Sequence, residues 1–360
     1  MDVLGYLVAF LAIVSLIIVH EWGHFQVARW CKMRVERFSI FFGPVLWSHK
    51  RKDTIYQVGS VPLGGFVQIT GMNPAEDFDR ADPRVYPNRP VWQRLLTIFA
   101  GPGANYLMAV LIGLFVFSYY GLPVPTDETE IQGVLPGKPA AKAGLQAGDV
   151  VVSVDGQPLT KEIPMTERIK ASAGKPVTLR VQRPVLGKSG QPIVVDGKPQ
   201  RNTLDVAVTP ESDGGTLRIG VQIGAGQRFE RKGFGAAAAF AVRWPYEFSK
   251  QNLKAIGELI SGKQKPEVSG PVRITAEIKK SIDRGLQSAL LIIMNLSIYL
   301  GLFNLLPFPA LDGGRLVFLG FELVSRKRVN QRVEAGVHMV GFVALFLLMI
   351  VVLFKDIFIG

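Results

Sequence analysis

The apolar residues of this chain are gathered into four long runs, separated by segments of mixed character. Each run holds about 18 or more residues with almost no charge, which is enough for an α-helix to cross the hydrocarbon core of a bilayer. We therefore expect four transmembrane helices. Their approximate bounds are residues 4–28, 95–120, 286–306 and 337–354.

The first run also has the position of a secretory signal peptide. Signal peptides begin with a basic segment and end at a cleavage site of small residues. Met1, Asp2 and Val3 precede this run without any basic residue, and no such cleavage site follows it. We therefore interpret the first run as a retained transmembrane helix.

Residues 55–70, between the first two runs, alternate apolar and polar positions around Pro62-Leu63-Gly64-Gly65. Alternation with turn residues in its middle predicts a β-hairpin. Backbone at membrane depth is tolerated only where it is buried in protein or lines a cavity. We expect this hairpin beside a site within the membrane. A cytoplasmic surface hairpin without a substrate role fits the pattern equally well.

Residues 127–225 are rich in Val and Gly and contain no long apolar run. Their pattern predicts a strand, a Gly-Pro turn, a short Ala-rich helix and a Gly-Asp turn into another strand. We therefore expect a domain inserted between two halves of a membrane core, residues 1–120 and 285–360. Residues 230–284 space aromatic and aliphatic residues among Lys and Glu, which predicts an amphipathic helix on the outer membrane surface. That helix could equally pack against the inserted domain.

The composition agrees with a membrane protein. Of 360 residues, 48% are hydrophobic and 19% are charged, and the mean hydropathy is +0.25. Soluble domains usually have about a quarter of their residues charged. The single cysteine, Cys31, excludes a fold held by internal disulfides.

The net charge of +12 comes from 41 Lys and Arg against 29 Asp and Glu. Basic residues are dense in residues 29–52 and 315–332, and the N-terminal tip has none. The positive-inside rule then places both basic loops in the cytoplasm, and both chain ends and the long middle segment outside. Because the basic residues form no stripe interleaved with aromatic residues, we expect membrane lipids as partners and no nucleic acid.

Three ionisable residues interrupt the first apolar run in the sequence His20-Glu21-Trp22-Gly23-His24. On a helix, positions i and i+4 share a face, so both imidazoles can bind one Zn²⁺ with Glu21 beside it as a general base. Ionisable groups are costly in an apolar helix, and functional use is the default expectation for them. The motif therefore predicts a catalytic zinc site.

A catalytic zinc site takes three protein ligands and keeps one position open. We interpret the remaining histidines, His49 and His338, as ordinary residues of the membrane interface. Asp312 is the better third ligand, because it follows the third apolar run on the side of the membrane where the first run ends. We expect two prolines to end that helix, and Gly313 and Gly314 to let the backbone pack closely behind the carboxylate.

The His-Glu-x-x-His motif, paired with the later segment 304–314 (Asn-x-x-Pro-x-Pro-x-Leu-Asp-Gly-Gly), resembles the site-2 protease family of intramembrane zinc metalloproteases. Within it, the chain is most similar to the bacterial regulator of sigma-E protease type. Arg273 departs from that group, in which glycine is common at this position. Four further segments match the group: Phe42-Gly43-Pro44, Pro62-Leu63-Gly64-Gly65-Phe66-Val67, Gly101-Pro102-Gly103-Ala104-Asn105 and Ser269-Gly270-Pro271-Val272.

The resemblance implies roles for individual residues. One zinc ion would be bound by His20, His24 and Asp312, and Glu21 would be the catalytic base. The residues expected to hold the substrate are Asn304, Gly64, Gly65 and Phe66. The inserted domain resembles a circularly permuted PDZ domain that ends at residues 218–221 and takes a peptide terminus along a strand edge. Its alternative role is only to block access to the membrane site.

The fold class expected is a polytopic α-helical membrane protein, with four transmembrane helices, a membrane-associated β-hairpin and an inserted α+β PDZ domain. The function implied is the second cleavage of a single-span bacterial inner-membrane protein already trimmed outside, such as an anti-sigma factor. A catalytically silent chaperone or scaffold that uses its PDZ domain is the main alternative. A zinc transporter is disfavoured, because the spans lack further acids or histidines to form a pathway.

Overall fold

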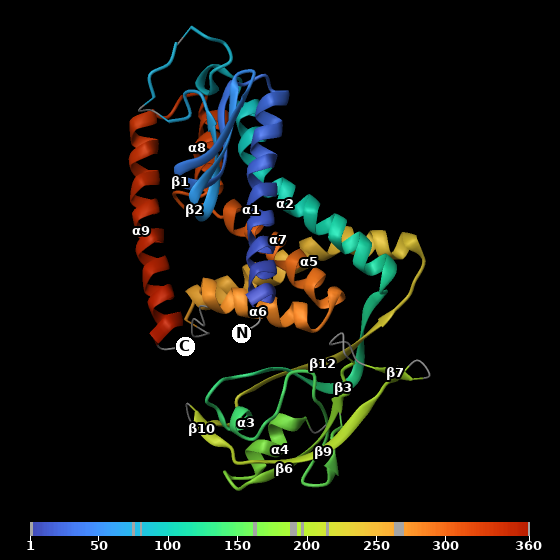
Figure 1. Cartoon of the computed structure of the whole chain (residues 1–360). Helices are drawn as coiled ribbons and strands as arrows, with labels where there is room; N and C mark the ends of the chain where they lie inside the picture. Colours follow the sequence, from blue (N-terminus) through green and yellow to red (C-terminus); the bar gives the residue numbers. More distant parts are fainter. Residues whose placement is uncertain are drawn as a thin grey trace. The chain divides into compact units, whose positions relative to one another are not determined.

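The computed structural model of this chain describes residues 3–73, 76–79, 81–160, 164–187, 193–195, 198–213, 216–262 and 270–358. Ser269 of the Ser-Gly-Pro-Val segment lies outside these residues. The chain forms two compact units (Figure 1). The helical unit combines Met1–Phe117 with Phe234–Gly360, and the β unit is Ser118–Gly233.

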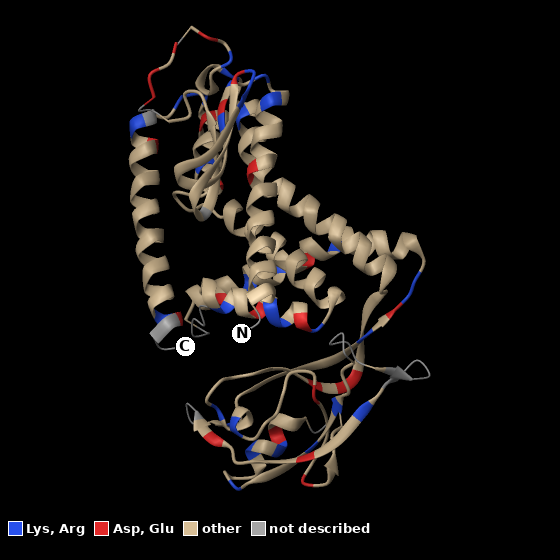
Figure 2. Ribbon diagram, in the orientation of Figure 1, with Lys and Arg blue, Asp and Glu red and all other residues tan. Residues whose placement is uncertain are grey.

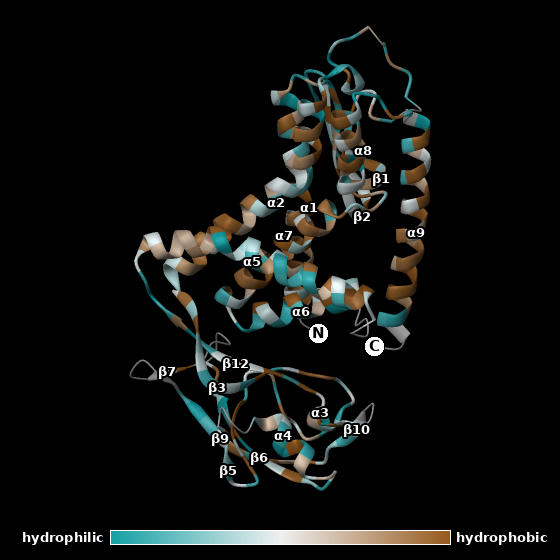
Figure 3. Ribbon diagram, turned by 180° about the vertical axis from the view of Figure 1, so that it is seen from behind, coloured by the Kyte–Doolittle hydropathy of each residue, from teal (hydrophilic) through white to brown (hydrophobic). Residues whose placement is uncertain are grey.

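The four predicted transmembrane helices are confirmed as helices long and apolar enough to cross a membrane. Figure 3 shows them as hydrophobic along most of their length, and Figure 2 shows no Lys, Arg, Asp or Glu along the middle of α2 and α9. The four helices are α1 (Val3–Trp30), α2 (Val91–Tyr119), α7 (Leu286–Leu305) and α9 (Gln331–Phe358).

The predicted hairpin within residues 55–70 is wrong in its pairing. These residues form most of β2 (Thr54–Ile69), whose partner is β1 (Val35–Arg51). Both strands bend, so that residues 37–40 lie between the two arms of β2, opposite residues 65–68 on one side and 55–58 on the other. The arms of β2 are thus separated by β1, which is why the turn residues near Gly64 mark a bend in one strand.

The segment after α7 contains a helix that we had placed in a loop. α8 (Asp312–Ser325) begins at the predicted third ligand. Gly313 and Gly314 do pack closely on the preceding backbone, since a Cβ on either would overlap a carbonyl group of Leu306 or Phe308. The end of α7 and the start of α8 are therefore folded tightly together behind Asp312.

Residues 230–284 contain two helices rather than one, α5 (Phe234–Ile260) and α6 (Pro271–Asp283). α5 packs on the transmembrane helices. The rings of Phe240 and Phe117 meet edge to face at 4.8 Å, and Trp244 donates a hydrogen bond to Asn295 of α7. Asp356 near the end of α9 accepts hydrogen bonds from the backbone N–H groups of Gly270, just before α6, and of Arg273 in its first turn.

A buried ion pair fixes α8 on α2. Two guanidinium nitrogens of Arg94 lie 3.0 and 2.7 Å from the Glu322 carboxylate oxygens, and both side chains are nearly buried. Arg328 also approaches Glu322, at 3.5 Å. Because α8 begins at Asp312, this pair helps to set where that carboxylate lies.

Breaking the pair is expected to destabilise the protein. Arg94→Met leaves the buried Glu322 carboxylate with the more distant Arg328, and we expect the free energy of unfolding to fall by about 3 kcal/mol. Thermal unfolding of the purified chain in detergent measures this. The double substitution with Glu322→Leu should regain most of the loss, and a single variant as stable as the wild type would contradict the assignment.

The β unit contains the predicted strand, short helix and second strand. Its main sheet is antiparallel, with the order β12-β3-β4-β6-β9 and β5 paired to β4. The strands of that sheet are β3 (Leu122–Val134), β4 (Val150–Val154), β5 (Gln157–Pro158), β6 (Val177–Pro184), β9 (Arg201–Val208) and β12 (Val221–Glu230). The small elements are α3 (Pro139–Lys142), α4 (Met165–Ala171), β7 (Val194–Val195), β8 (Lys198–Pro199), β10 (Glu211–Asp213) and β11 (Thr216–Arg218).

The predicted Gly-Asp turn is anchored by its aspartate. Asp149 is fully buried, and its carboxylate accepts hydrogen bonds from the guanidinium of Arg183 and from the backbone N–H of Gln146. On the sheet surface, the Arg180 guanidinium lowers the pKa of the Asp205 carboxyl on the neighbouring strand. These pairs connect the strands of the β unit around its own apolar core, which includes Ile131, Leu145, Val151, Leu179 and Val181.

Candidate metal centre

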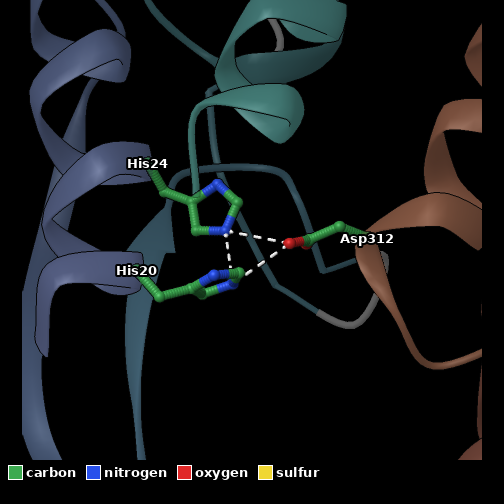
Figure 4. A group of neighbouring side chains, drawn as sticks. All are labelled: His20, His24 and Asp312. Carbon is green, nitrogen blue, oxygen red and sulfur yellow. Dashed lines mark hydrogen bonds and ion pairs between the residues drawn. The ribbon is translucent and has the colours of Figure 1, made fainter. Parts of the chain in front are cut away.

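His20 and His24 lie one turn apart on α1 and present their rings on the same face, as the spacing predicts. Figure 4 shows the two imidazoles projecting from α1, each with one nitrogen toward the Asp312 carboxylate. Their Nε2 atoms are 3.2 Å apart, and both residues are buried. Two nitrogen donors thus converge at one point inside the helical unit.

Asp312 supplies the third donor from the first residue of α8. Its Oδ2 lies 3.1 Å from Nε2 of His20 and 3.2 Å from Nε2 of His24. Among the residues that the structure describes, this buried oxygen receives no well-aligned hydrogen bond. Within the described part of the chain, these three side chains form the group of potential ligands that could hold a metal ion.

The donor set fits zinc. Imidazole nitrogens and carboxylate oxygens are common Zn²⁺ ligands, and a tetrahedral ion with ligands at about 2.0 Å needs donor atoms roughly 3.3 Å apart. The three separations of 3.1 to 3.2 Å are close to that spacing. Three donors also leave a fourth position open, as a catalytic site requires.

Two glycines allow α2 to pack against the histidine-bearing turn of α1. A Cβ on Gly101 would overlap the His24 imidazole at Nε2 and Cε1, and a Cβ on Gly23 would overlap the backbone of Ala100. The Gly-Pro-Gly-Ala-Asn segment therefore has a steric role, since its first glycine leaves the space that the His24 ring fills.

α2 also contacts the far side of each histidine ring. The backbone carbonyl of Thr97 lies 2.8 Å from Nδ1 of His24, and the side-chain amide of Asn105 lies 3.1 Å from Nδ1 of His20. We had assigned neither residue a role. Asn105 could have been recognised as a candidate functional residue, because it is a polar residue within an apolar span. Thr97 contributes only its backbone carbonyl, so its residue type gives no indication of this contact.

Glu21 lies on α1 against the bent sheet. It interacts electrostatically with His20, His24 and Asp312, and the backbone of Val67 in β2 lies close to its carboxylate. At Gly65 a Cβ would come within 3.2 Å of Cγ of Glu21. This arm of β2 therefore lies against Glu21 with its backbone, and Glu21, Gly64 and Gly65 together line a small cavity of about 10 Å³.

The other predicted substrate residues lie apart from the three donors. Asn304 is half-buried in α7 and donates to the carbonyl of Leu300 at 2.9 Å. Phe66 stacks on Phe42 with ring centres 5.7 Å apart, and the same Phe42 ring lies against Gly64. Of the predicted substrate residues, Gly64 and Gly65 line the small cavity beside Glu21.

The two remaining histidines are outside the cluster, as we expected. His49 stacks on Trp47 on the exposed side of β1. His338 has a structural contact that we did not foresee, since its Nδ1 accepts a hydrogen bond from the backbone N–H of Ala310 at 2.9 Å. This bond braces the turn that leads into Asp312.

Two histidines and a glutamate on one membrane-length helix, facing an aspartate from another, define the class of membrane-embedded metallopeptidases. Sequence comparison identifies the family. The model of peptidase family M50 matches residues 8–348, so the chain belongs to that family. This confirms the resemblance to site-2 proteases.

Relatives of this chain carry names that agree with the family. It is 33% identical to a protein of Nostoc sp. named "putative zinc metalloprotease", over 98% of this chain and 96% of the relative. A Brucella suis protein with the same description is 31% identical, over 98% of this chain and 95% of the relative. The zinc metalloprotease RasP of Geobacillus kaustophilus is 28% identical, over 99% and 97%. The chain is therefore a zinc metalloendopeptidase with several membrane-spanning helices.

Proposed function

We propose that His20, His24 and Asp312 hold one zinc ion and that Glu21 is the catalytic base for cleavage of a membrane-spanning substrate. The observation that supports this most strongly is the triangle of buried donor atoms, with sides of 3.1 to 3.2 Å. Two of its corners, His20 and His24, are on one helix, and the third, Asp312, comes nearly 300 residues later in the sequence. A metal ion bound by all three would require these two segments to meet.

Zinc, when bound, supplies Lewis acidity that makes water nucleophilic near neutral pH and polarises a peptide carbonyl. The chain supplies the rest. Glu21 takes the proton from the attacking water on a carboxylate oxygen and passes it to the leaving amine. Its side chain lies against the Gly64-Gly65 backbone of the sheet. The burial of both histidines keeps other water away from the donors.

The bent sheet is the element suited to present the substrate. A transmembrane helix shields its carbonyls in its own hydrogen bonds, so the bond to be cut has to be drawn into an extended segment. Strand addition to a sheet edge does this. In our proposal Gly64, Gly65 and Phe66 offer backbone beside Glu21 for a substrate strand to pair with, and Asn304 holds the substrate backbone from α7.

The β unit is proposed to be a PDZ domain of the circularly permuted type. β12 is at the end of the strand order of the main sheet and directly follows Ile219-Gly220. An edge strand after such a turn is suited to pair with a peptide terminus. In this role the β unit would select substrates that are already trimmed outside the membrane. A domain that only blocks access is the alternative.

The substrate class that we propose is a single-span membrane protein, cut for the second time in a regulated cascade, such as an anti-sigma factor. The proposal places the chain in the bacterial inner membrane, with the β unit and both termini outside and the metal centre near the cytoplasmic side. The basic residues of 29–52 and 315–332 support this orientation.

Cysteine labelling tests the orientation. Cys31 is buried, and in a Cys31→Ser background the exposed positions Lys170 and Lys327 each receive a single cysteine. In intact spheroplasts, a membrane-impermeant maleimide should label Lys170→Cys in the β unit and should label Lys327→Cys only after the membrane is opened. The reverse pattern would refute the orientation.

The experiment that tests the function compares membrane fragments in cells that express either the wild type or Glu21→Gln. Fragments of single-span proteins should accumulate only with the variant, because the first cut still occurs and the second does not. Identical fragment patterns would favour the silent scaffold, and zinc analysis of the purified chain would then show whether the centre binds metal at all.

A further inference from the structure

The ring of His20 contacts two different kinds of partner. Its Nε2 faces the other two donors, 3.2 Å from His24 and 3.1 Å from Asp312. Its Nδ1 lies 3.1 Å from the side-chain amide of Asn105 on α2. Asn105 is fully buried, and its Oδ1 has no hydrogen-bond partner among the described residues.

The chemistry of imidazole determines what that amide must do. A neutral imidazole has one N–H and one lone pair. If Nε2 of His20 is to bind a metal, its lone pair has to face the ion, and the hydrogen is then on Nδ1. Nδ1 therefore has to donate, and its partner has to be an acceptor.

The amide oxygen of Asn105 is that acceptor. The two ends of an asparagine amide have nearly the same shape, so their assignment rests on the hydrogen bonds that they make. With the NH₂ group toward His20, the amide would offer a donor to a donor and leave Oδ1 buried without a partner. Turning the amide by half a rotation gives Oδ1 the Nδ1–H of His20.

We infer that Asn105 is a positioning residue of the metal centre, whose side-chain oxygen accepts the Nδ1–H of His20 and so directs Nε2 at the zinc. This inference rests on the proposed role of His20 as a ligand. His24 is held in the same manner, because its Nδ1 faces the carbonyl of Thr97, which can only accept. α2 thus provides one oxygen to each ligand histidine.

The position of Asn105 is itself fixed. Its backbone carbonyl accepts a hydrogen bond of 2.8 Å from the hydroxyl of Ser297, which is fully buried in α7. This contact leaves the amide of Asn105 free to act on His20. Complete burial also prevents bulk water from replacing the amide oxygen if it is removed.

Two substitutions separate an accepting role from a merely structural one. Asn105→Leu keeps the shape and removes the acceptor, and we expect a 10- to 100-fold loss of zinc affinity, the usual effect of losing a partner of a ligand histidine. Asn105→Asp keeps an acceptor and removes the NH₂ group, and it should bind zinc within about threefold of the wild type or more tightly. If the NH₂ group were the functional end, Asn105→Asp would instead lose affinity.

The measurement is a competition between the purified full-length chain and a chromophoric zinc chelator, and the absorption spectrum of the Co²⁺-substituted protein reports the geometry of the centre. Asn295→Leu is the matched control, because Asn295 accepts from Trp244 and lies outside the cluster, and it should leave the affinity unchanged. If Asn105→Leu fails to fold, Asn105→Asp alone decides.

Wild-type affinity in a folded Asn105→Leu, or a tenfold loss in Asn105→Asp, would overturn the inference. Asp312→Ala in the same titration identifies where a failure lies. If Asp312→Ala loses zinc while Asn105→Leu does not, the ligand set is correct and only the role of Asn105 is wrong. If Asp312→Ala also binds normally, the ligand set is wrong and the inference falls with it.

Discussion

Replacing Glu21 with glutamine is expected to reduce peptide cleavage by about 10³-fold or more while zinc stays bound. Glutamine has the size and shape of glutamate, so the packing of α1 against Gly65 of the sheet should be kept. It cannot take a proton from water. General-base catalysis contributes about 10²- to 10⁴-fold in enzymes, and its loss falls on the chemical step.

Cleavage of a fluorogenic single-span substrate by the purified chain in detergent measures the loss. Zinc content per chain and the unfolding midpoint are determined on the same preparation, and both should equal the wild-type values. A Glu21→Gln preparation that contains zinc and cleaves within tenfold of the wild type would remove Glu21 from the mechanism. Loss of zinc together with activity would instead assign Glu21 to metal binding.

Adding one methyl group at Gly101 is expected to empty the metal centre. The Cβ of Gly101→Ala would overlap the His24 ring at Nε2, which is one of the three donor atoms. The ring has to move, or α2 has to withdraw from α1 and carry Thr97 and Asn105 away from the histidines. Either shift misplaces a ligand, so we expect at least a 100-fold loss of zinc affinity, the upper end of the range for losing an outer partner.

Gly103→Ala provides the matched control. It introduces the same methyl group on the same helix two residues further on, where its nearest contact is the Phe99 ring at 3.4 Å, an ordinary van der Waals distance. Both substitutions raise helix propensity by up to about 1 kcal/mol, so neither should unwind α2. Equal zinc affinities for the two variants would contradict the close packing of α2 on His24.

The convergence of the candidate metal donors was predictable in part, because these residues either lie close together in the sequence or carry unusual chemistry for their position. The spacing of His20 and His24 places both on one helix face, and Asp312 was notable as an acid just after an apolar run. The long helices were predictable for a similar reason, because the length of an apolar run relates directly to the thickness of a bilayer. In each case the signal lies within one segment.

The bent sheet and α8 were not predictable to the same degree. The alternation of residues 55–70 correctly indicated extended chain. It could not indicate the pairing partner of each half, which is residues 37–40 of β1 in both cases. α8 was missed because its first turn follows two prolines and contains two glycines, which favour a loop by local propensity. Its packing on α2, fixed by Arg94 and Glu322, overrides that propensity.

The contacts around the ligands were the least visible in the sequence. Gly101 matched a family segment, yet its steric role appears only when α1 and α2 are packed together. The contribution of Thr97 is a backbone carbonyl, which any residue would carry. Asn105 could have been singled out as a polar residue in an apolar span, but nothing in the sequence connects it with His20.

The central claim is that this chain cuts a peptide bond within the membrane at the centre formed by His20, His24 and Asp312. The most direct test reconstitutes the purified chain in liposomes with a single-span substrate and determines the masses of both products. We predict a cut inside the membrane-spanning segment of the substrate. Chelation and Glu21→Gln should each abolish this cut, and added zinc should restore it in the chelated wild-type protein. Cleavage confined to the aqueous segments of the substrate, or persisting in Glu21→Gln, would contradict the account.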